Sequence, residues 1–231
     1  MSDAQPDELA RIYANRFAGS RAYRARVWQV LVPRFFQQFL PENGTVLDLG
    51  CGYGEFSNNI RAQKRLAMDL NPDSRAHLAA GVEFLQQDCS HTWQVEPNRL
   101  DLVFTSNFFE HLPDKETLSR TLDQAFRCLK PGGRLVAMGP NIKLVPGAYW
   151  DFWDHYLPLT ETSLAEGMVN RGFEIERCHD KFLPFTLVGG PDYPLWILEV
   201  YLKFPFLWRL GGKQFLVVAR KPIASPGRPA A

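Results

Sequence analysis

Apolar positions along the chain follow two different spacings, and from residue 45 onward the two alternate. Short runs of apolar and β-branched residues predict strands, most of them bounded by glycine, proline or polar residues. Between several of these runs, apolar residues three and four positions apart predict amphipathic helices. The expected strands cover 45–49, 65–70, 82–86, 100–105, 134–138, 173–177 and 214–219, and the expected helices cover 55–61, 114–129 and 160–171.

Strands that alternate with helices in this way predict an α/β fold. In such a fold the sheet is mostly parallel, and helices cover both of its faces. The clearest helix is 114–129, where Leu118, Leu122 and Phe126 recur on one face. The Pro-Gly-Gly sequence at 131–133 is expected to end this helix before the next strand begins. We therefore expect a Rossmann-like, doubly wound sheet.

A further helix is expected ahead of the first strand. Residues 22–40 place Val27, Leu31 and Phe35 at intervals of four, which is helical spacing. Pro33 lies inside this stretch and is expected to kink or break the helix, because proline lacks the backbone N–H that a helix interior requires.

The rest of the chain departs from simple alternation. We expect a single domain over residues 1–221 that begins with an N-terminal helical cap at 1–43. Two aromatic segments, 140–160 and 181–212, interrupt the alternating pattern and are expected to form insertions on the acceptor side of the site. The proline-bearing end, 222–231, is expected to be a disordered tail.

Composition and charge exclude several classes of function. The chain of 231 residues is 45% hydrophobic, which is enough to build a buried core. Its 26 basic residues balance 25 acidic ones, so no long-range field attracts nucleic acid. No apolar run reaches the roughly 18–20 residues that stable insertion into a membrane requires.

The cysteines and the first residues indicate where the protein works. The four cysteines are far apart and form no CxxC pair, which argues against a zinc site or a disulfide framework. The polar start MSDAQPDELAR shows no signal peptide. We therefore expect a cytoplasmic protein with reduced thiols and no metal ion.

A glycine-rich loop carries the strongest functional signal. Gly50, Gly52 and Gly54 directly follow the apolar run 45–49, and such glycines allow a tight turn and close approach of the backbone to a ligand. Asp48 adds a carboxylate beside the loop. Asp69 lies 19 positions after Gly50 at the end of the second expected strand, the distance at which a carboxylate reaches ribose hydroxyls.

The spacing of this loop argues against two other nucleotide sites. The dinucleotide pattern GxGxxG requires a small residue where this chain has Glu55, and no GxxxxGK[ST] phosphate loop is present. A carboxylate beside the loop suits a cationic ligand better than a pyrophosphate. These features together fit a nucleoside that carries a sulfonium and an amino acid.

The stretches VLDLGCGYG, MDL, QQDCS and LKPGGRL resemble the ordered motifs of class I S-adenosylmethionine-dependent methyltransferases. The resemblance covers about residues 44–140 and implies a seven-stranded sheet with an antiparallel terminal strand. It also implies a cofactor site with S-adenosylmethionine as the methyl donor. The residues that it places at the methionine part, the ribose, the adenine or the methyl group are Asp48, Gly50, Cys51, Gly52, Asp69, Leu70, Asp88, Cys89 and Asn107.

Two histidines are candidates for catalysis. Removing a proton from a hydroxyl or an acidic carbon requires a base, and histidine is the usual one near neutral pH. His155 is the preferred base, and His111, which follows Glu110 after the fourth expected strand, is the second candidate. Each also has a purely structural alternative, such as capping a backbone or packing in a lid.

The segment 150–156 is expected to bind the acceptor. Aromatic faces beside carboxylates hold sugars and other flat, amphipathic molecules. The candidate acceptor-binding residues are Trp150, Asp151, Trp153, Asp154 and Tyr156. The alternative is a packed lid in which these aromatic residues complete the core.

The second insertion, 181–212, leaves three interpretations open. Its sequence LWILEVYLKFPFLWRL is apolar on nearly all sides and is too short to span a bilayer. It can pack in the core, form a homodimer surface, or touch a membrane or a lipid-linked acceptor. This segment and WDFWDH resemble methyltransferases of surface-polysaccharide pathways, which implies a glycan-like acceptor.

These observations lead to one hypothesis and two alternatives. The hypothesis is O-methylation of a small or glycan-like acceptor by in-line displacement. The first alternative is a C- or N-methyltransferase that acts on a lipophilic metabolite. The second is a protein that binds S-adenosylmethionine without catalysis.

Overall fold

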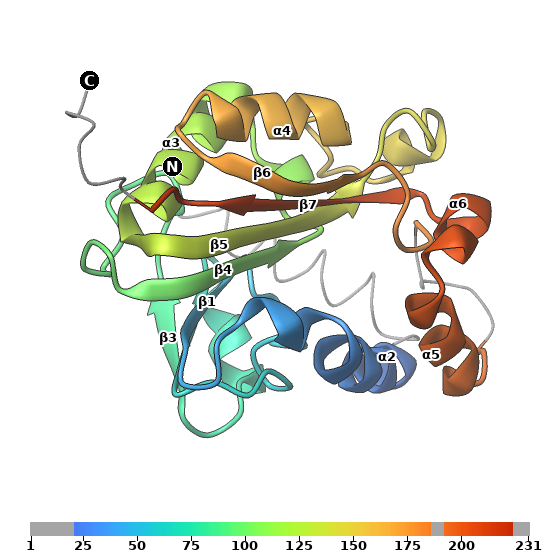
Figure 1. Cartoon of the computed structure of the whole chain (residues 1–231), viewed down its shortest axis with the longest axis horizontal. Coiled ribbons are helices and arrows are strands. Elements are labelled where there is room, and N and C mark those ends of the chain that lie inside the picture. Colours follow the sequence, from blue (N-terminus) through green and yellow to red (C-terminus); the bar gives the residue numbers. More distant parts are fainter. Residues whose placement is uncertain (1–20, 186–191, 224–231) are drawn as a thin grey trace.

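The computed structural model describes residues 21–185 and 192–223. The first half of the expected cap and nearly all of the expected tail therefore lie outside the described residues. Seven strands form one sheet in the order β3-β2-β1-β4-β5-β7-β6 (Figure 1). They are β1 (Thr45–Leu49), β2 (Lys64–Asp69), β3 (Val82–Gln86), β4 (Leu100–Ser106), β5 (Leu129–Pro140), β6 (Glu174–His179) and β7 (Gln214–Arg220).

The sheet confirms the predicted fold class. The pairs β1–β2, β2–β3, β1–β4 and β4–β5 are parallel, whereas β7 is antiparallel to both of its neighbours, β5 and β6. Every expected strand is present, and the terminal strand is the antiparallel one. This is the Rossmann-like, doubly wound sheet that the alternating pattern and the family resemblance predicted.

Alternate residues of the central strands enter two different cores, because successive side chains point to opposite faces of a sheet. On one face, Leu47 and Val103 pack with residues of the helices α3 (Lys115–Cys128) and α4 (Glu161–Val169). On the other face, Leu102 and Phe104 pack with the N-terminal helix and the C-terminal helical segment. Burial on both faces explains why these strands read as continuous apolar runs.

The second face is closed by helices that are far apart in the sequence. Helix α2 (Arg21–Arg34) contacts α5 (Leu195–Lys203), and the two lie side by side in Figure 1. The short helix α6 (Trp208–Gly211) follows α5 at the same end of the molecule. Pro33 falls in the last turn of α2, and a short 3₁₀ helix, Phe36–Phe39, continues the segment.

Two expectations are wrong. The helix predicted at 55–61 is a run of turns, in which Asn58 and Ile60 donate four residues back but the N–H of Asn59 bonds to Phe56, because its own side chain occupies the carbonyl of Glu55. Asn59 Nδ2 donates to the carbonyl of Glu55 at 2.7 Å, and Asn58 bonds to the backbone of His77 and Ala79. In addition, β5 begins at Leu129 rather than at 134, so the Pro-Gly-Gly sequence is part of the strand.

The register of the parallel strands brings their carboxyl ends together. Leu49 is aligned with Met68 on one side and with Thr105 on the other, and Thr105 is aligned with Ala137. The loops that follow β1, β2, β4 and β5 therefore all leave the sheet at the carboxyl ends of its parallel strands. Ligands of open α/β sheets bind at these carboxyl ends.

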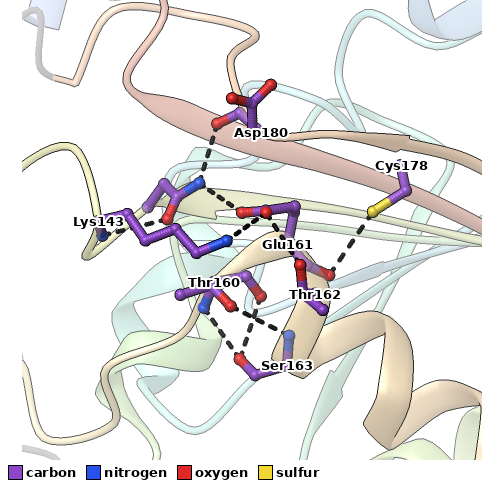
Figure 2. Close-up of polar contacts among 8 residues, drawn as sticks. Lys143, Thr160, Glu161, Thr162, Ser163, Cys178 and Asp180 are labelled. Carbon is purple, nitrogen blue, oxygen red and sulfur yellow. Dashed lines mark hydrogen bonds and ion pairs between the residues drawn. The ribbon is translucent and has the colours of Figure 1, made fainter.

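A polar network anchors the segment between β5 and α4 (Figure 2). The buried carboxylate of Glu161 accepts hydrogen bonds from Lys143 Nζ and, at 2.7 Å, from Asn141 Nδ2. Asn141 Nδ2 also donates to the carbonyl of Asp180 at 3.0 Å, just after β6. Thr160 and Ser163 cap α4 reciprocally. Both ends of the segment 141–160 are thus held against the sheet.

Candidate active site

A cavity of about 290 Å³ lies at the carboxyl ends of the strands. The glycine-rich loop and the end of β4 contribute polar groups to its wall. Helices α2 and α5 contribute mostly apolar ones, among them Val27, Leu31, Ile197 and Leu198. The cavity therefore has a polar end at the sheet and an apolar wall between the two helices.

The glycine loop follows β1 in a conformation that only glycine adopts easily. Gly50 has φ +69°, and Gly52 has φ +50°. A Cβ atom on Gly50 would lie 2.3 Å from the ring of Phe108, so no side chain fits at this position. The N–H of Gly52 donates to Asp69 Oδ2 at 2.8 Å, which ties the loop after β1 to the end of β2.

Asp48 lies buried on the floor of the cavity. Its Oδ2 accepts the backbone N–H of Ser57 at 3.1 Å. Burial, opposed by the hydrogen bonds from Ser57 and reinforced by the negative charges of Glu55 and Asp69, raises the pKa of Asp48 to about 7. Glu55 also lines the cavity, where it forms an ion pair of 2.9 Å with Arg24 of α2.

The carboxylates after β2 and β3 lie next to this cavity and do not line it. Asp69 accepts N–H groups of Gly52 and Asn71, and burial raises its pKa in spite of these bonds. Asp88 Oδ1 accepts both the N–H and the hydroxyl of Ser90 at 2.8 Å. Cys89 is buried, and Leu70 directly follows β2. Asn107, by contrast, lines the cavity with φ +49°.

The structure brings both candidate histidines to the polar end of the cavity. Their rings are 5.0 Å apart between centroids, and both line the cavity with Glu110. His111 Nδ1 lies 2.8 Å from the carbonyl oxygen of Asp154 and 3.2 Å from its carboxylate. Burial opposes a charge on His111, but the hydrogen bond to Asp154 and the charge of Glu110 outweigh it and raise its pKa.

The same cluster could hold a cation. One potential ligand atom each from Glu110, His111 and His155 lies within 4.8 Å of the other two. However, Asp154 and Glu110 raise the pKa of His111, so they also favour a proton at this cluster. Because Asp154 binds Nδ1, only Nε2 of His111 would be left to bind a metal.

Two residues of the segment 150–156, which the sequence suggested for acceptor binding, face the cavity. Phe152 and His155 line it, and their rings stack at 4.7 Å. Asp154 is buried behind His111. The other candidates for acceptor binding, Trp150, Asp151, Trp153 and Tyr156, are exposed on the protein surface and do not line the cavity.

Sequence reasoning did not single out several residues of the cavity wall. Trp28 of α2 and Tyr201 of α5 line it, yet helical spacing explains both as core positions. Glu110 was noted only as a neighbour of His111. The signal that could have found the α5 wall is the concentration of aromatic residues in the second half of the chain, because such a concentration is consistent with a pocket or an interaction surface.

Comparisons with known proteins agree with this geometry. A family model described as a methyltransferase domain matches residues 20–177, which is more than half of the chain. Trans-aconitate 2-methyltransferase of Variovorax paradoxus is 32% identical over 114 residues, 46% of this chain and 42% of that protein. YqeM of Bacillus subtilis is 29% identical over 112 residues, 45% of each chain. The chain thus matches less than half the length of these curated relatives.

Solved structures share the fold. A methyltransferase from Archaeoglobus fulgidus superposes with a TM-score of 0.65 at 20% identity, over 89% of this chain and 99% of that one. A TehB-like methyltransferase from Corynebacterium glutamicum gives 0.59 at 16% identity, over 95% and 100% of the two chains.

The chain belongs to the class I methyltransferases, the family whose domain model covers it from the N-terminal helix to β6. Members of this class take their methyl group from S-adenosylmethionine. No helix within residues 21–185 and 192–223 is long and apolar enough to cross a membrane.

Proposed function

We propose that the domain transfers a methyl group from S-adenosylmethionine to a hydroxyl group of a small acceptor with an apolar body. The observation that carries this proposal is the position of His155. This buried histidine lines the polar end of a cavity whose other wall is apolar. A base at that position suits an acceptor oxygen that must lose a proton.

The donor half of the proposal rests on charge and on space. S-adenosylmethionine carries a sulfonium and an ammonium group, and Asp48, Glu55 and Asp69 make the site acidic. The ring of Phe108 fills the space that a side chain on Gly50 would need, so the loop meets the cavity with its backbone. Asp48 with Gly50, Cys51 and Gly52 would hold the methionine part. Asp69 would hold the ribose, Leu70, Asp88 and Cys89 the adenine, and Asn107 would lie near the methyl group.

When bound, S-adenosylmethionine supplies an electrophilic methyl group for in-line displacement. The protein contributes alignment of the acceptor and removal of its proton. In this proposal His155 accepts the proton. His111 is a positioning residue, because its bond to Asp154 fixes its ring, and Asp154 and Glu110 raise its pKa.

The apolar wall refines the choice of acceptor. Val27, Leu31, Ile197 and Leu198 offer no hydrogen bonds to a free sugar. They suit an acceptor in which a glycan-like or phenolic hydroxyl group is joined to an apolar part. The same wall favours a second candidate function, C- or N-methylation of a lipophilic metabolite. That reaction needs no base where the acceptor atom is already nucleophilic.

Thermal unfolding with S-adenosylmethionine, S-adenosylhomocysteine and NADH tests the donor half. Either adenosyl ligand at about 100 times its dissociation constant should stabilise the wild type by about 2.7 kcal/mol. For a domain of this size that corresponds to about 5–10 °C. NADH should have no effect, and Asp69→Ala should abolish the shift. The matched control is Asp73→Ala, an exposed aspartate four residues away.

Two outcomes would contradict the donor site. Equal shifts in the wild type and in Asp69→Ala would remove Asp69 from it. The absence of a shift with either adenosyl ligand would overturn the proposal. For the acceptor half, formation of S-adenosylhomocysteine with a panel of hydroxyl compounds separates turnover from binding alone.

A further inference from the structure

Helix α5 has two apolar faces. Its inner side contributes Ile197, Leu198 and Tyr201 to the cavity wall. Its outer side carries Trp196, Val200 and Phe204, spaced four residues apart on one stripe. A soluble helix normally exposes a polar face to water, so an apolar outer face indicates a contact with something other than water.

The outer stripe continues past the end of α5. The rings of Phe204 and Phe206 are 6.0 Å apart between centroids. Trp196 is 65% exposed and Phe206 is 64% exposed, values far above those of core residues. We call Trp196, Val200, Phe204 and Phe206 the outer α5 face.

Basic side chains border this face. Lys203 is exposed in the same stripe, with its Nζ 5.9 Å from the centre of the Phe204 ring. Arg209 is exposed on α6, and Lys181 Nζ donates to its carbonyl at 3.3 Å. The nearest acidic residue of α5, Glu199, is paired with Arg34 of α2. Aromatic and aliphatic side chains beside lysine and arginine are typical of helices that lie in a membrane interface.

The cavity opens beside the outer α5 face. Tyr193 and Ile197 both line the cavity, and they are 57% and 40% exposed. Ile197 lies three residues before Val200 on α5, so the two side chains are neighbours on the helix and the rim of the cavity adjoins the apolar stripe. An amphiphilic molecule could pass from a lipid surface to the cavity without exposing its apolar part to water.

We propose that the outer α5 face docks on the surface of an anionic phospholipid membrane and places the rim of the cavity there. The apolar side chains enter the boundary between head groups and acyl chains, while Lys203 and Arg209 meet the negative head groups. The acceptor would then be a membrane-borne amphiphile. The inference about the acceptor rests on the proposed function, whereas the docking itself does not.

The charges favour a membrane over a second copy of the chain. In a twofold dimer the same patch meets itself, so Lys203 and Arg209 would meet a surface that carries the same basic side chains. Such a dimer would also cover the rim at Tyr193 and Ile197. An anionic bilayer neutralises the same charges and leaves lateral access to the rim.

Flotation of the purified chain with lipid vesicles tests the proposal without turnover, so the result does not depend on the proposed function. We expect the wild type to float with vesicles of phosphatidylcholine and phosphatidylglycerol in equal parts. Binding should weaken with pure phosphatidylcholine and with added salt. The double variant Trp196→Ser with Phe206→Ser should bind the mixed vesicles at least tenfold more weakly.

Two further variants keep the test decisive. Lys203→Glu with Arg209→Glu reverses the two basic charges and keeps the four apolar side chains of the outer α5 face, and it should also bind at least tenfold more weakly. Trp153→Ser is the matched control, because Trp153 is 79% exposed in the other insertion, and it should bind like the wild type. Far-UV circular dichroism checks that each variant is folded.

Two results would overturn the proposal. One is wild-type protein that does not float with anionic vesicles. The other is equal flotation of the wild type and of the folded charge and aromatic variants. Light scattering adds a further check. A wild-type dimer that becomes a monomer in Trp196→Ser with Phe206→Ser, without vesicle binding in either, would assign the face to a second copy.

Discussion

His111 and Asp154 are 43 residues apart in the sequence and meet through a single ring nitrogen. Nδ1 of His111 lies 2.8 Å from the carbonyl oxygen of Asp154 and 3.2 Å from its carboxylate. The contact joins the loop after β4 to the segment after β5. It therefore fixes His111 and, next to Asp154, the candidate base His155.

The first prediction concerns the charge of His111. Because its pKa is raised, its contribution to stability is complete below the unfolded value of about 6.5 and is lost as the pH rises through the folded pKa. Asp154→Asn removes the carboxylate and should lower that pKa. An NMR titration of the imidazole measures it directly. An unchanged titration in Asp154→Asn would contradict the assignment.

A second prediction concerns Asp48. Its pKa of about 7 means that the ligand-free protein loses stability as the pH rises from about 4 through 7, while the buried carboxylate ionises. Asp48→Asn should therefore be more stable than the wild type at pH 8, by about 2–4 kcal/mol, and the difference should vanish near pH 4. Urea unfolding at several pH values measures this.

Binding of the donor provides the control for the Asp48 variant. The substitution should weaken binding of S-adenosylmethionine although it stabilises the empty protein. If binding and stability both stay unchanged at pH 8, Asp48 is not a buried carboxylate of the donor site.

A third prediction separates the two candidate reactions. If His155 removes a proton from a hydroxyl acceptor, His155→Ala should lower kcat by about 10²- to 10⁴-fold, with donor binding unchanged. Steady-state kinetics and donor titration measure the two effects separately. A variant that keeps its kcat would favour an acceptor atom that needs no base, such as the nitrogen or carbon of a lipophilic metabolite.

The network at Glu161 leads to a fourth prediction. Burial raises the pKa of Glu161, but the hydrogen bonds from Lys143, Asn141 and Thr162 outweigh burial and lower it. The carboxylate therefore stabilises the fold above about pH 4.5, and this stabilisation is lost as the pH falls through the lowered value.

Glu161→Gln should cost about 1–3 kcal/mol at pH 7 and less below pH 4. Chemical denaturation at both pH values measures this. Glu166→Gln, at an exposed position one turn later on α4, is the matched control and should have little effect. Equal stability of the two variants at pH 7 would show that the network does not anchor the segment.

A fifth prediction concerns metal removal. Because Asp154 and Glu110 raise the pKa of His111 and so favour a proton over a metal ion at this cluster, we expect dialysis against EDTA to leave donor binding and methyl transfer unchanged. Product formation before and after dialysis measures this. Loss of activity that added magnesium or zinc restores would instead assign Glu110, His111 and His155 as metal ligands.

Local patterns predicted the sheet well. The central strands β1 and β4 are short apolar runs, and Gly50 and Gly52 have the positive φ angles that glycine adopts most easily. The run 55–61 was harder, because Asn58 and Asn59 bond to the backbone in a way that apolar spacing does not reveal.

The apolar wall of the cavity could not be predicted in the same way. This wall forms only when α2 packs against α5, through contacts such as that of Arg34 with Glu199, which are 165 residues apart. In the segment 150–156, no local pattern distinguishes aromatic residues that face the cavity from those that face solvent. Only tertiary packing turns Phe152 into the cavity and leaves Trp153 outside.

The place of β7 has a consequence for how the protein is made. The ribosome synthesises β7 after all six other strands, yet it lies between β5 and β6. While the chain grows, β5 exposes an unpaired edge and β6 has no neighbour to join. The free edges of β5 and β6 remain open to wrong pairing until β7 is available to join them. The sheet is therefore completed only by the last of its strands to be made, and loss of β7 should lead to aggregation.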